Sequence, residues 1–371
     1  MPHDIYSRDS TVYIVTGEDK LSTFHRAVEQ SGFIPHLLNQ WQASGKSKAD
    51  FRIAVKPNIM TASIFQEDSP VYTDPGLVEE LIRLMQAEGF TSFAVVESQN
   101  VYNYAYTGRT VPLVAAMCGY SGQGYSIVDL TEDTVPFDYG GVLGPHVAGR
   151  VWLEADYRIS FAKNKSHWQC LYTACIKNVY GCLPMWDKMR HYHGKGRGGR
   201  DIEFFQATVL SAEKIPVHFG FLDAWISGDG LTGHVRDPHP NPTHTFLASD
   251  NIFALDWVVG EKMQVDPFHN YVIQEAVHRW GTIHITRVGN MTPWYPWDNV
   301  RPIVVVAFNV IEEFYHLRRF MSRAVATQMD SRFPPVGQGR WFFQITQAIV
   351  RVLEGVLTRA TDPNKMRRLP R

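Results

Sequence analysis

The residues best suited to chemistry lie between positions 157 and 181. A short apolar run, Ile159 to Ala162, is followed at once by Lys163, Lys165 and His167. Apolar runs of this kind are typical of strands buried in an α/β sheet, and ligands collect beyond the carboxyl ends of such strands. Ammonium groups resist burial unless they are paired. We therefore interpret the charged residues at the end of this run as a candidate site.

Two kinds of chemistry suit lysines that lie close together. They lower one another's pKa, which makes one of them usable as a base or nucleophile near neutral pH. They are equally suited to hold a carboxylate or phosphate as fixed charges. We expect Lys163 and Lys165 to bind or polarise an anionic group, with His167 as general acid or base. The alternative is a set of solvated lysines at the edge of a sheet.

Three other predicted strands also end in polar residues. The strand Phe51 to Val55 is followed by Lys56 and Asn58, Phe93 to Val96 by Glu97, and Val217 to Leu222 by Asp223. The carboxyl ends of parallel strands share one edge of a sheet, so these polar side chains should meet the first group there.

A segment of helical character, Trp168 to Tyr180, adds Lys177 and Asn178 to the predicted site. The catalytic residues of this hypothesis are Lys56, Lys163, Lys165, His167 and Asp223, with Asp223 orienting a lysine or a histidine. Its substrate-binding residues are Asn58, Glu97, Lys177, Asn178, His191 and His193.

His191 and His193 stand at the start of a basic, glycine-rich loop. Its glycines, Gly194, Gly196 and Gly199, match the pattern GxGxxG. No strand precedes them and no suitably placed acidic residue follows, so a dinucleotide site is not indicated. A basic lid over an anionic ligand is one interpretation of this loop, and an ordinary surface loop is the other.

The sequence identifies no metal and no cofactor. The four cysteines, at positions 118, 170, 175 and 182, include no CxxC pair. Histidines 234, 239 and 244 are spaced five residues apart among prolines, which suits no standard metal geometry. Reduced, buried thiols in a cytoplasmic protein are the favoured interpretation.

The order of the predicted elements is that of an α/β protein with a mostly parallel sheet and flanking helices. Strands are predicted at 12–16, 51–55, 93–96, 125–130, 159–162, 217–222 and 245–248, and helices at 21–32, 75–89, 168–180, 202–214, 252–263 and 267–281. Ser249 and Asp250 are expected to cap the helix at 252–263. We expect residues 1–290 to form the α/β domain. If it divides into two lobes around a cleft, the boundary falls near residue 150.

Residues 291–371 differ in character from the rest. A Trp/Pro linker leads into two amphipathic segments, Val305 to Met329 and Trp341 to Arg359. From position 300 onwards there are twelve Lys and Arg against five Asp and Glu, whereas the whole chain carries a net charge of −1. Such helices suit contact with a partner or an anionic membrane surface, or packing on their own core. The overall charge argues against a nucleic-acid binder.

Neither a signal peptide nor a transmembrane segment is expected. A signal peptide has a basic segment followed by an apolar one, and the N-terminal residues contain neither. The most hydrophobic run, Ile303 to Phe308, is far too short to span a membrane.

Several motifs together resemble the DUF362 family. They are VKPN (55–58), TDP (73–75), VVES (95–98), FAKNKSH (161–167), IKNVYGCLP (176–184), LDAWISGDG (222–230) and ASDNIFALD (248–256). The resemblance extends from about Val12 to Thr286. Many relatives carry a ferredoxin-like cysteine cluster and are regarded as redox-linked, and this chain lacks that cluster.

More distantly, the layout is similar to the nickel-pincer lactate racemase superfamily, in which two α/β lobes enclose a cleft. This resemblance implies a cleft lined by Lys56, Lys163, Lys165, His167, Lys177 and Asn178.

The sequence therefore predicts an enzyme that acts on a small anionic metabolite by acid–base chemistry, and its ten Trp and sixteen Tyr permit an aromatic one. Isomerisation, decarboxylation and reduction with an external donor all fit this description. One alternative is a non-catalytic binding or assembly protein that docks through its basic C-terminal helices. Another is a redox partner that holds a cofactor without cysteine ligands.

Overall fold

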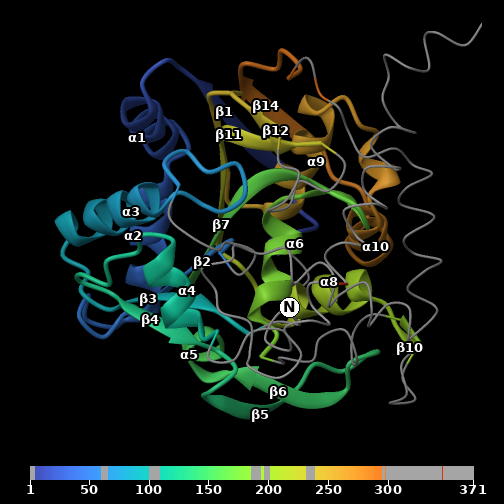
Figure 1. Cartoon of the computed structure of the whole chain (residues 1–371). Helices are drawn as coiled ribbons and strands as arrows, with labels where there is room; N and C mark the ends of the chain where they lie inside the picture. Colours follow the sequence, from blue (N-terminus) through green and yellow to red (C-terminus); the bar gives the residue numbers. More distant parts are fainter. Residues whose placement is uncertain are drawn as a thin grey trace, which may run out of the picture.

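A ten-stranded sheet forms the centre of the protein (Figure 1). The computed structural model describes residues 5–59, 66–99, 109–184, 194–195, 201–230, 239–294, 297 and 345. The strands of the sheet are β1 (Ser10–Thr16), β2 (Ile53–Pro57), β3 (Phe93–Glu97), β4 (Ser126–Asp129), β7 (Tyr157–His167), β8 (Leu171–Thr173), β11 (Phe219–Asp229), β12 (His239–Asn241), β13 (Thr245–Ser249) and β14 (Ile285–Gly289). Two short hairpins pair β5 (Thr134–Asp138) with β6 (Pro145–Gly149) and β9 (Gly194–Lys195) with β10 (Asp201–Ile202).

Most strands of the sheet run in one direction. Their order is β14-β1-β13-β11-β7-β2-β3-β4, with β12 added beside β11 and β8 beside β7. The neighbours from β11 through β7, β2 and β3 to β4 are all parallel, as are β1 and β14. Only β13, in the main order of the described strands, is antiparallel to both its neighbours. The carboxyl ends of the parallel strands consequently share one edge, and β13 begins there.

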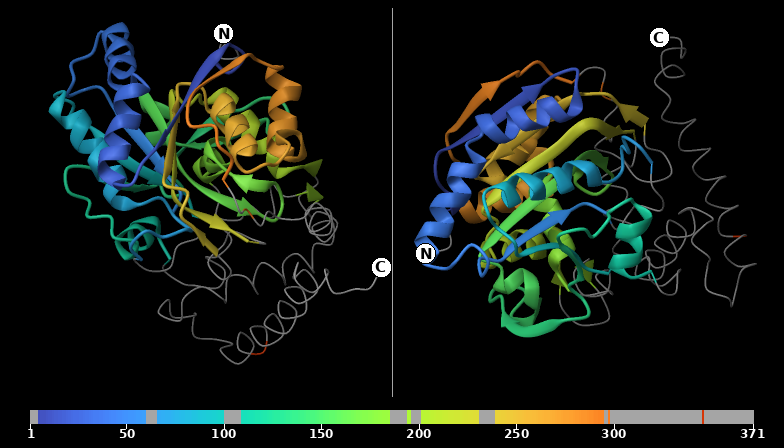
Figure 2. Two further views of the ribbon diagram at one scale, coloured as in Figure 1. Left: turned by 90° about the horizontal axis from the view of Figure 1, so that it is seen from above. Right: turned by 90° about the vertical axis from the view of Figure 1, so that its left-hand side faces the viewer.

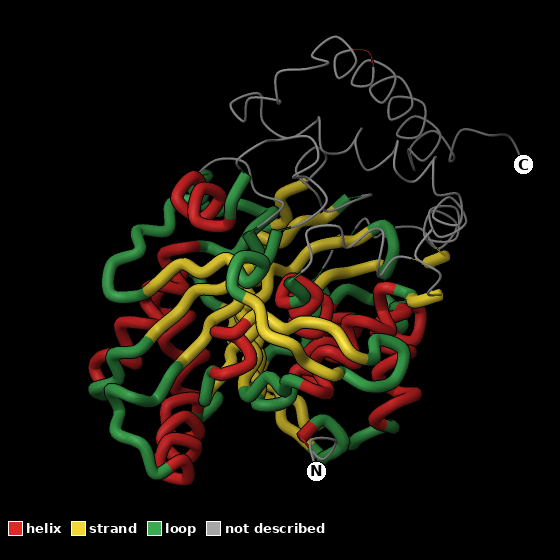
Figure 3. Tube along the Cα trace, turned by 90° about the horizontal axis from the view of Figure 1, so that it is seen from below, coloured by secondary structure: helices red, strands yellow, loops and turns green. Residues whose placement is uncertain are grey.

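Helices cover both faces of the sheet (Figures 2 and 3). One face carries α1 (Lys20–Gln30), α2 (Phe33–Ser44), α3 (Pro75–Ala87) and α4 (Val111–Met117). The other carries α5 (Arg150–Glu154), α6 (Cys175–Val179), α8 (Phe204–Lys214), α9 (Ile252–Lys262) and α10 (Tyr271–Trp280), together with the 3₁₀ turns η3 (Tyr180–Cys182) and η4 (Pro267–His269). Alternate residues of each central strand enter two separate hydrophobic cores, which is why these strands are mostly apolar before their carboxyl ends.

The predicted fold class, a mostly parallel sheet flanked by helices, is confirmed. Each of the seven predicted strands is present within a few residues of its expected position. The helix that starts at Pro75 is also present, and its N-cap is Asp74, whose side chain accepts a hydrogen bond from the Gly76 amide. The basic C-terminal helices lie outside the described residues, apart from a single helical position, Ile345.

Three local predictions were wrong. The strand expected to end at Ala162 continues as β7 to His167, because this segment pairs with β11 and β8. The helix expected from Trp168 is a turn and strand β8 first, and helix α6 begins only at Cys175. The cap of α9 is Asn251 rather than Asp250, since the Asn251 side chain accepts from the amides of the first turn.

The connections of the central strands locate a crevice. After β2 the chain forms α3 on one face, whereas after β7 it forms α6 on the other face. Strands β2 and β7 are neighbours, so the helices that follow them diverge around a topological switch point. In open α/β sheets ligands bind at such a point, outside the carboxyl ends of the strands. Lys56 and Lys163 belong to these two strands.

No helix within the described ranges is both long enough and apolar enough to cross a membrane.

A histidine at the opposite, amino edge should make the fold sensitive to acid. His218 precedes β11, stacks on Tyr157 with ring centroids 5.1 Å apart, and accepts a 3.0 Å hydrogen bond at Nδ1 from the Arg158 amide. Burial lowers its pKa from 6.5 to about 3, and Arg158 and His36 act in the same direction. Below pH 6.5 the unfolded chain therefore binds a proton that the folded protein does not.

We expect the free energy of unfolding to fall as the pH is lowered from 6.5 towards 3, by up to about 1.4 kcal/mol per pH unit from this group. His218→Gln should flatten that part of the curve. Urea unfolding of both proteins over this pH range is the measurement, and parallel curves would contradict the assignment.

Candidate active site

The candidate site lies at the carboxyl edge of the sheet, around the crevice between β2 and β7. Lys56, Lys163 and Lys165 are each 1 % exposed, so their ammonium groups are removed from water. Buried ammonium groups require oxygen partners, and neighbouring elements supply them. We use the name lysine cluster for Lys56, Asn58, Glu97, Lys163, Lys165, Lys177, Asn178 and Asp223.

Lys56 is neutralised by a carboxylate from the next strand. Its Nζ donates to Glu97 Oε2 at 2.7 Å, to Asn178 Oδ1 at 3.0 Å and to the Pro57 carbonyl at 2.6 Å. Asn178 is fixed in turn, because its amide nitrogen donates to the Lys56 carbonyl at 2.7 Å and to Ser160 Oγ at 3.1 Å. The pair thus joins the ends of β2 and β3 to helix α6.

The absence of a side chain at Gly181 makes room for this pair. A Cβ at that position would lie 2.3 Å from Glu97 Oε1 and 2.4 Å from Lys56 Cε. The Gly181 carbonyl also accepts a 3.0 Å hydrogen bond from the amide of Ser98, the residue after β3. Glycine at 181 therefore lets η3 pack directly on the ion pair.

Lys163 is neutralised from the other side, by β11. Its Nζ donates to Asp223 Oδ2 at 3.0 Å, and Asp223 is fully buried. The amide of Asp74 donates to the same oxygen at 3.1 Å, and the amide of Trp225 donates to Oδ1 at 3.1 Å. Asp223 thereby fixes the position of Lys163 and is itself held by three donors.

The third buried lysine, Lys165, has a strongly lowered pKa. Its Nζ donates to Asn58 Oδ1 at 3.0 Å and to the Val71 carbonyl at 2.8 Å. Burial, together with the charges of Lys177, Lys163 and Lys56, lowers the pKa of Lys165 from 10.5 to about 7. The neutral amine is therefore available near neutral pH, where an ordinary lysine is fully charged.

Residues 71–73, just before α3, support Lys165. The predicted site did not contain them. Thr73 Oγ1 donates to the Phe161 carbonyl of β7 at 2.8 Å and accepts a 2.9 Å hydrogen bond from the Asn58 amide. The Tyr120 hydroxyl donates to the Thr73 carbonyl at 3.1 Å. These bonds hold the Val71 carbonyl and Asn58 in place. The TDP motif at 73–75 was the available signal.

Lys20 fastens the same segment to the first helix. Its Nζ lies 2.6 Å from Asp68 Oδ1 and 2.7 Å from Asp74 Oδ2. Asp68 has a φ of 53°, in the left-handed region that side chains other than glycine seldom adopt. The ion pairs keep residues 68–74 against the carboxyl edge.

Asp256, on α9, positions helix α6. Its two carboxylate oxygens accept hydrogen bonds from the amides of Cys175 at 2.7 Å and Ile176 at 2.8 Å. Burial raises the pKa of Asp256 to about 8, although these two amide donors oppose the shift. Because Asn178 is on the same short helix, Asp256 indirectly fixes the partner of Lys56.

His167 and Lys177 lie at the margin of this network. The amide of Gln169 donates to His167 Nδ1 at 3.2 Å, so the proton of the neutral ring resides on Nε2. The ammonium group of Lys177 lies over the Tyr180 ring, 4.6 Å from its centroid, and 5.3 Å from the Phe204 centroid. Such cation–π contacts favour the charged lysine.

The structure brings together most of the predicted site. Lys56 with Glu97 and Asn178, Lys163 with Asp223, and Lys165 with Asn58 are in direct contact. His191 and His193 lie outside the described residues. In the described part of the chain, no group of three or more His, Cys, Asp or Glu side chains gathers as a metal site would require.

Two lysine-to-methionine substitutions should differ sharply in their effect on stability. Lys163→Met leaves the Asp223 carboxylate buried without its cation, which should lower the free energy of unfolding by about 3–5 kcal/mol. Lys165→Met removes the donor to Asn58 Oδ1 and the Val71 carbonyl, and should cost no more than about 1–2 kcal/mol. Chemical denaturation at neutral pH measures both.

The double variant Lys163→Met/Asp223→Asn serves as the control, because it removes the stranded charge and should recover most of the loss. Equal losses for the two single variants would show that the Lys163–Asp223 pair does not carry the proposed charge compensation.

Comparison with known proteins places these residues in a wider group. A thylakoid-associated protein of Synechocystis sp. is 26 % identical over 226 residues, which cover 58 % of this chain and 64 % of that protein. The lactate racemase apoprotein of Thermoanaerobacterium thermosaccharolyticum has a TM-score of 0.35 at 11 % identity, over 62 % of this chain and 52 % of the racemase. The chain thus spans less than two thirds of the length of either protein.

The family match covers the whole lysine cluster. Residues 53–261, more than half of the chain's 371 residues, match the family described as a domain of unknown function, DUF362. Every strand that contributes to the lysine cluster lies within these bounds. The resemblance seen in the sequence motifs is confirmed, and the chain belongs to the DUF362 family.

Proposed function

We propose that this protein is an enzyme that acts on a small anionic metabolite by acid–base chemistry at the lysine cluster. The observation that carries the proposal is the buried Lys165 amine, which donates to Asn58 Oδ1 and the Val71 carbonyl and lies among three other lysines. Strongly perturbed ionisable groups gather at functional sites, and this one stands at the switch point of the sheet.

The charge balance of the lysine cluster supports an anionic ligand. The cluster contains four lysines and two carboxylates, and each carboxylate bonds one lysine. The lysines therefore outnumber the carboxylates within the cluster, and an anion beside Lys165 would reduce the repulsion among their ammonium groups. In a buried site of low dielectric constant, such charges attract a carboxylate or phosphate far more strongly than surface lysines do.

The proposed division of labour follows from the contacts. Lys56 and Lys163 are locked in ion pairs and supply fixed positive charge. Lys165, with a pKa of about 7, is suited to take up a proton from a bound substrate or to return it. His167, with Nδ1 occupied by the Gln169 amide, would exchange a proton through Nε2 as a second acid or base.

Anion binding should be coupled to proton uptake. An anion beside Lys165 favours the charged amine and raises its pKa, so near pH 8 the complex should take up close to about one proton. Isothermal titration calorimetry with acetate, malonate, benzoate and inorganic phosphate, in buffers of different ionisation enthalpy, measures this number directly.

Lys165→Met should abolish the proton uptake and weaken binding by about tenfold or more. Lys46→Met is the matched control, because Lys46 pairs with Asp156 at the far edge of the sheet and should leave both quantities unchanged. Binding of an anion without proton uptake by the unaltered protein would count against the role of Lys165.

A second candidate function is docking on an anionic membrane surface. It is favoured by the excess of twelve basic over five acidic residues from position 300 onwards. The thylakoid association named for the Synechocystis protein agrees with it. Basic side chains near such a surface contribute about 1 kcal/mol each.

Charge removal at the end of the chain tests the docking hypothesis. Replacement of Lys365, Arg367, Arg368 and Arg371 by Gln should cost about 4 kcal/mol of binding to vesicles that contain anionic lipid, measured by co-sedimentation at low salt. Arg83→Gln on the exposed side of α3 is the control. Equal sedimentation of all three proteins would refute this hypothesis.

A further inference from the structure

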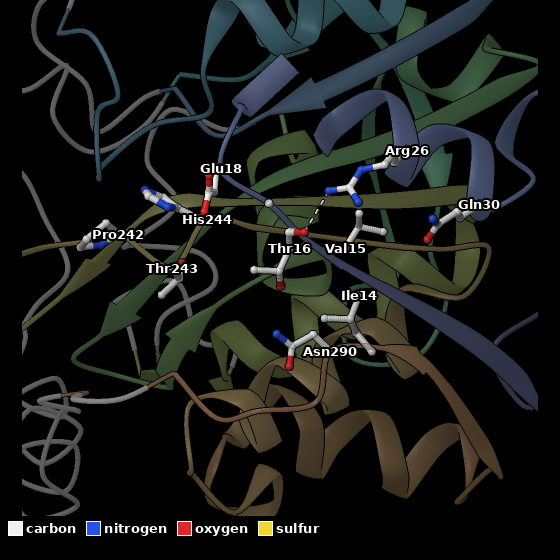
Figure 4. Close-up of a pocket in the computed structure, with 11 residues that line it drawn as sticks. Ile14, Val15, Thr16, Glu18, Arg26, Gln30, Pro242, Thr243, His244 and Asn290 are labelled. Carbon is white, nitrogen blue, oxygen red and sulfur yellow. Dashed lines mark hydrogen bonds between the residues drawn. The ribbon is translucent and has the colours of Figure 1, made fainter. Parts of the chain in front are cut away.

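A cavity of about 640 Å³ lies at the same edge of the sheet, beside β1 and β13 (Figure 4), and no residue of the lysine cluster lines it. Much of its lining comes from the carboxyl end of β1 and from the residues just before β13. Its lining includes Thr16, Gly17, Glu18, Arg26, Thr243, His244 and Asn290. Volumes of this size are common for small-molecule sites.

Two opposite charges stand around this cavity. The Arg26 Nη2 donates to the Thr16 carbonyl at 2.9 Å and to Thr23 Oγ1 at 3.4 Å, which points the guanidinium across the cavity. Glu18 lies beside His244 on the other side (Figure 4). Neither Arg26 nor Glu18 forms an ion pair with any residue in the described ranges.

Gly17 lets Arg26 reach the backbone of β1. A Cβ at this position would lie 2.1 Å from Thr23 Oγ1 and 2.6 Å from Arg26 Nη2. The chain therefore has no side chain at the point where the guanidinium crosses it. The remaining donors of the guanidinium can then face a ligand.

The wall formed by His244 is rigid. Its φ of 44° is in the left-handed region, and such strained positions cluster at binding sites. The ring stacks on Trp225 with centroids 4.4 Å apart. The His244 amide donates to the Trp225 carbonyl at 2.9 Å, and its carbonyl accepts from the Gly17 amide at 3.1 Å. Both sides of the cavity are thus tied together.

We propose that this cavity binds a second small molecule, a zwitterion of the amino-acid class. Its carboxylate accepts from the Nε or Nη1 donors of Arg26, since Nη2 already bonds Thr16 and Thr23, and its ammonium group pairs with Glu18. A ligand with only one of these charges leaves the opposite group of the cavity without a partner, and is bound less tightly.

This cavity adjoins the lysine cluster through β11. Thr243 Oγ1 donates its proton to the Ala224 carbonyl. In the 2.7 Å hydrogen bond between Ser227 and Thr243, Ser227 Oγ is therefore the donor and Thr243 Oγ1 the acceptor. Ser227 Oγ then accepts from Asn164 Nδ2 at 2.9 Å, and Asn164 lies between the two lysines of β7. The two sites are neighbours with separate linings.

The test uses the full-length protein and the twenty L-amino acids as probes, by calorimetry or ligand-observed NMR. For the best binder, the N-acetyl derivative and the carboxamide should each bind about tenfold or more weakly, since each lacks one charge. Arg26→Gln should remove the penalty for the carboxamide, and Glu18→Gln the penalty for the N-acetyl derivative, because each variant deletes the group that the missing charge would meet.

Two controls keep the outcome clear. Glu29→Gln, an exposed change on α1 away from the cavity, and Lys165→Met in the lysine cluster should both leave amino-acid binding unchanged. Failure of every amino acid to bind at up to about 10 mM would overturn the proposal. So would binding that survives both cavity variants and is lost in Lys165→Met, which would assign the ligand to the lysine cluster instead.

Discussion

The carboxyl edge of the sheet depends on the compensation of buried ammonium groups by buried carboxylates. Removing a lysine from water costs several kcal/mol, and only a close and well-oriented anion offsets that cost. Glu97 does so for Lys56 and Asp223 for Lys163, each from the neighbouring strand. Both pairs cross between strands, so they form only when the sheet is assembled in this register. The same bonds that neutralise the lysines therefore tie β2 to β3 and β7 to β11.

This compensation makes Lys165 distinctive. Lys56 and Lys163 are anchored by carboxylates, and their charges act on the Lys165 amine, which donates to Asn58 Oδ1 and the Val71 carbonyl. The rest of the site holds these positions. Thr73 fixes the loop that offers the carbonyl, and Asp256 fixes the helix that supplies Asn178. The lowered pKa of Lys165 thus depends on several supporting contacts.

The sequence was sufficient to predict which strand ends would meet, because parallel strands bring their carboxyl ends to one edge. It was insufficient where a partner is distant in the chain. The extension of β7 to His167 depends on its pairing with β11 and β8, and Lys163 is tolerated inside a strand only because Asp223 lies opposite. The contact of Lys165 with the Val71 carbonyl was also unpredictable from the sequence, because every residue has a backbone carbonyl. Asn178 was predicted from its position beside Lys177, in the segment of helical character that follows the strand.

The reversed strand β13 explains why the edge has room for two sites. A parallel strand contributes the residues after its end to this edge, but β13 contributes the residues before its start, Thr243 and His244. These two residues meet the end of β1, where Gly17 and Glu18 follow. A cavity lined by uncommitted charges consequently forms beside β1, while the compensated lysines occupy the switch point between β2 and β7. Strand β11 contributes to both the lysine cluster and the cavity. Its Asp223 binds Lys163, and its Trp225, two residues later, stacks on His244. A change in the conformation of β11 after Asp223 would therefore alter both the lysine cluster and the cavity. The register of β11 against β7 shifts between Asp223 and Gly228, in the part of the strand that adjoins both.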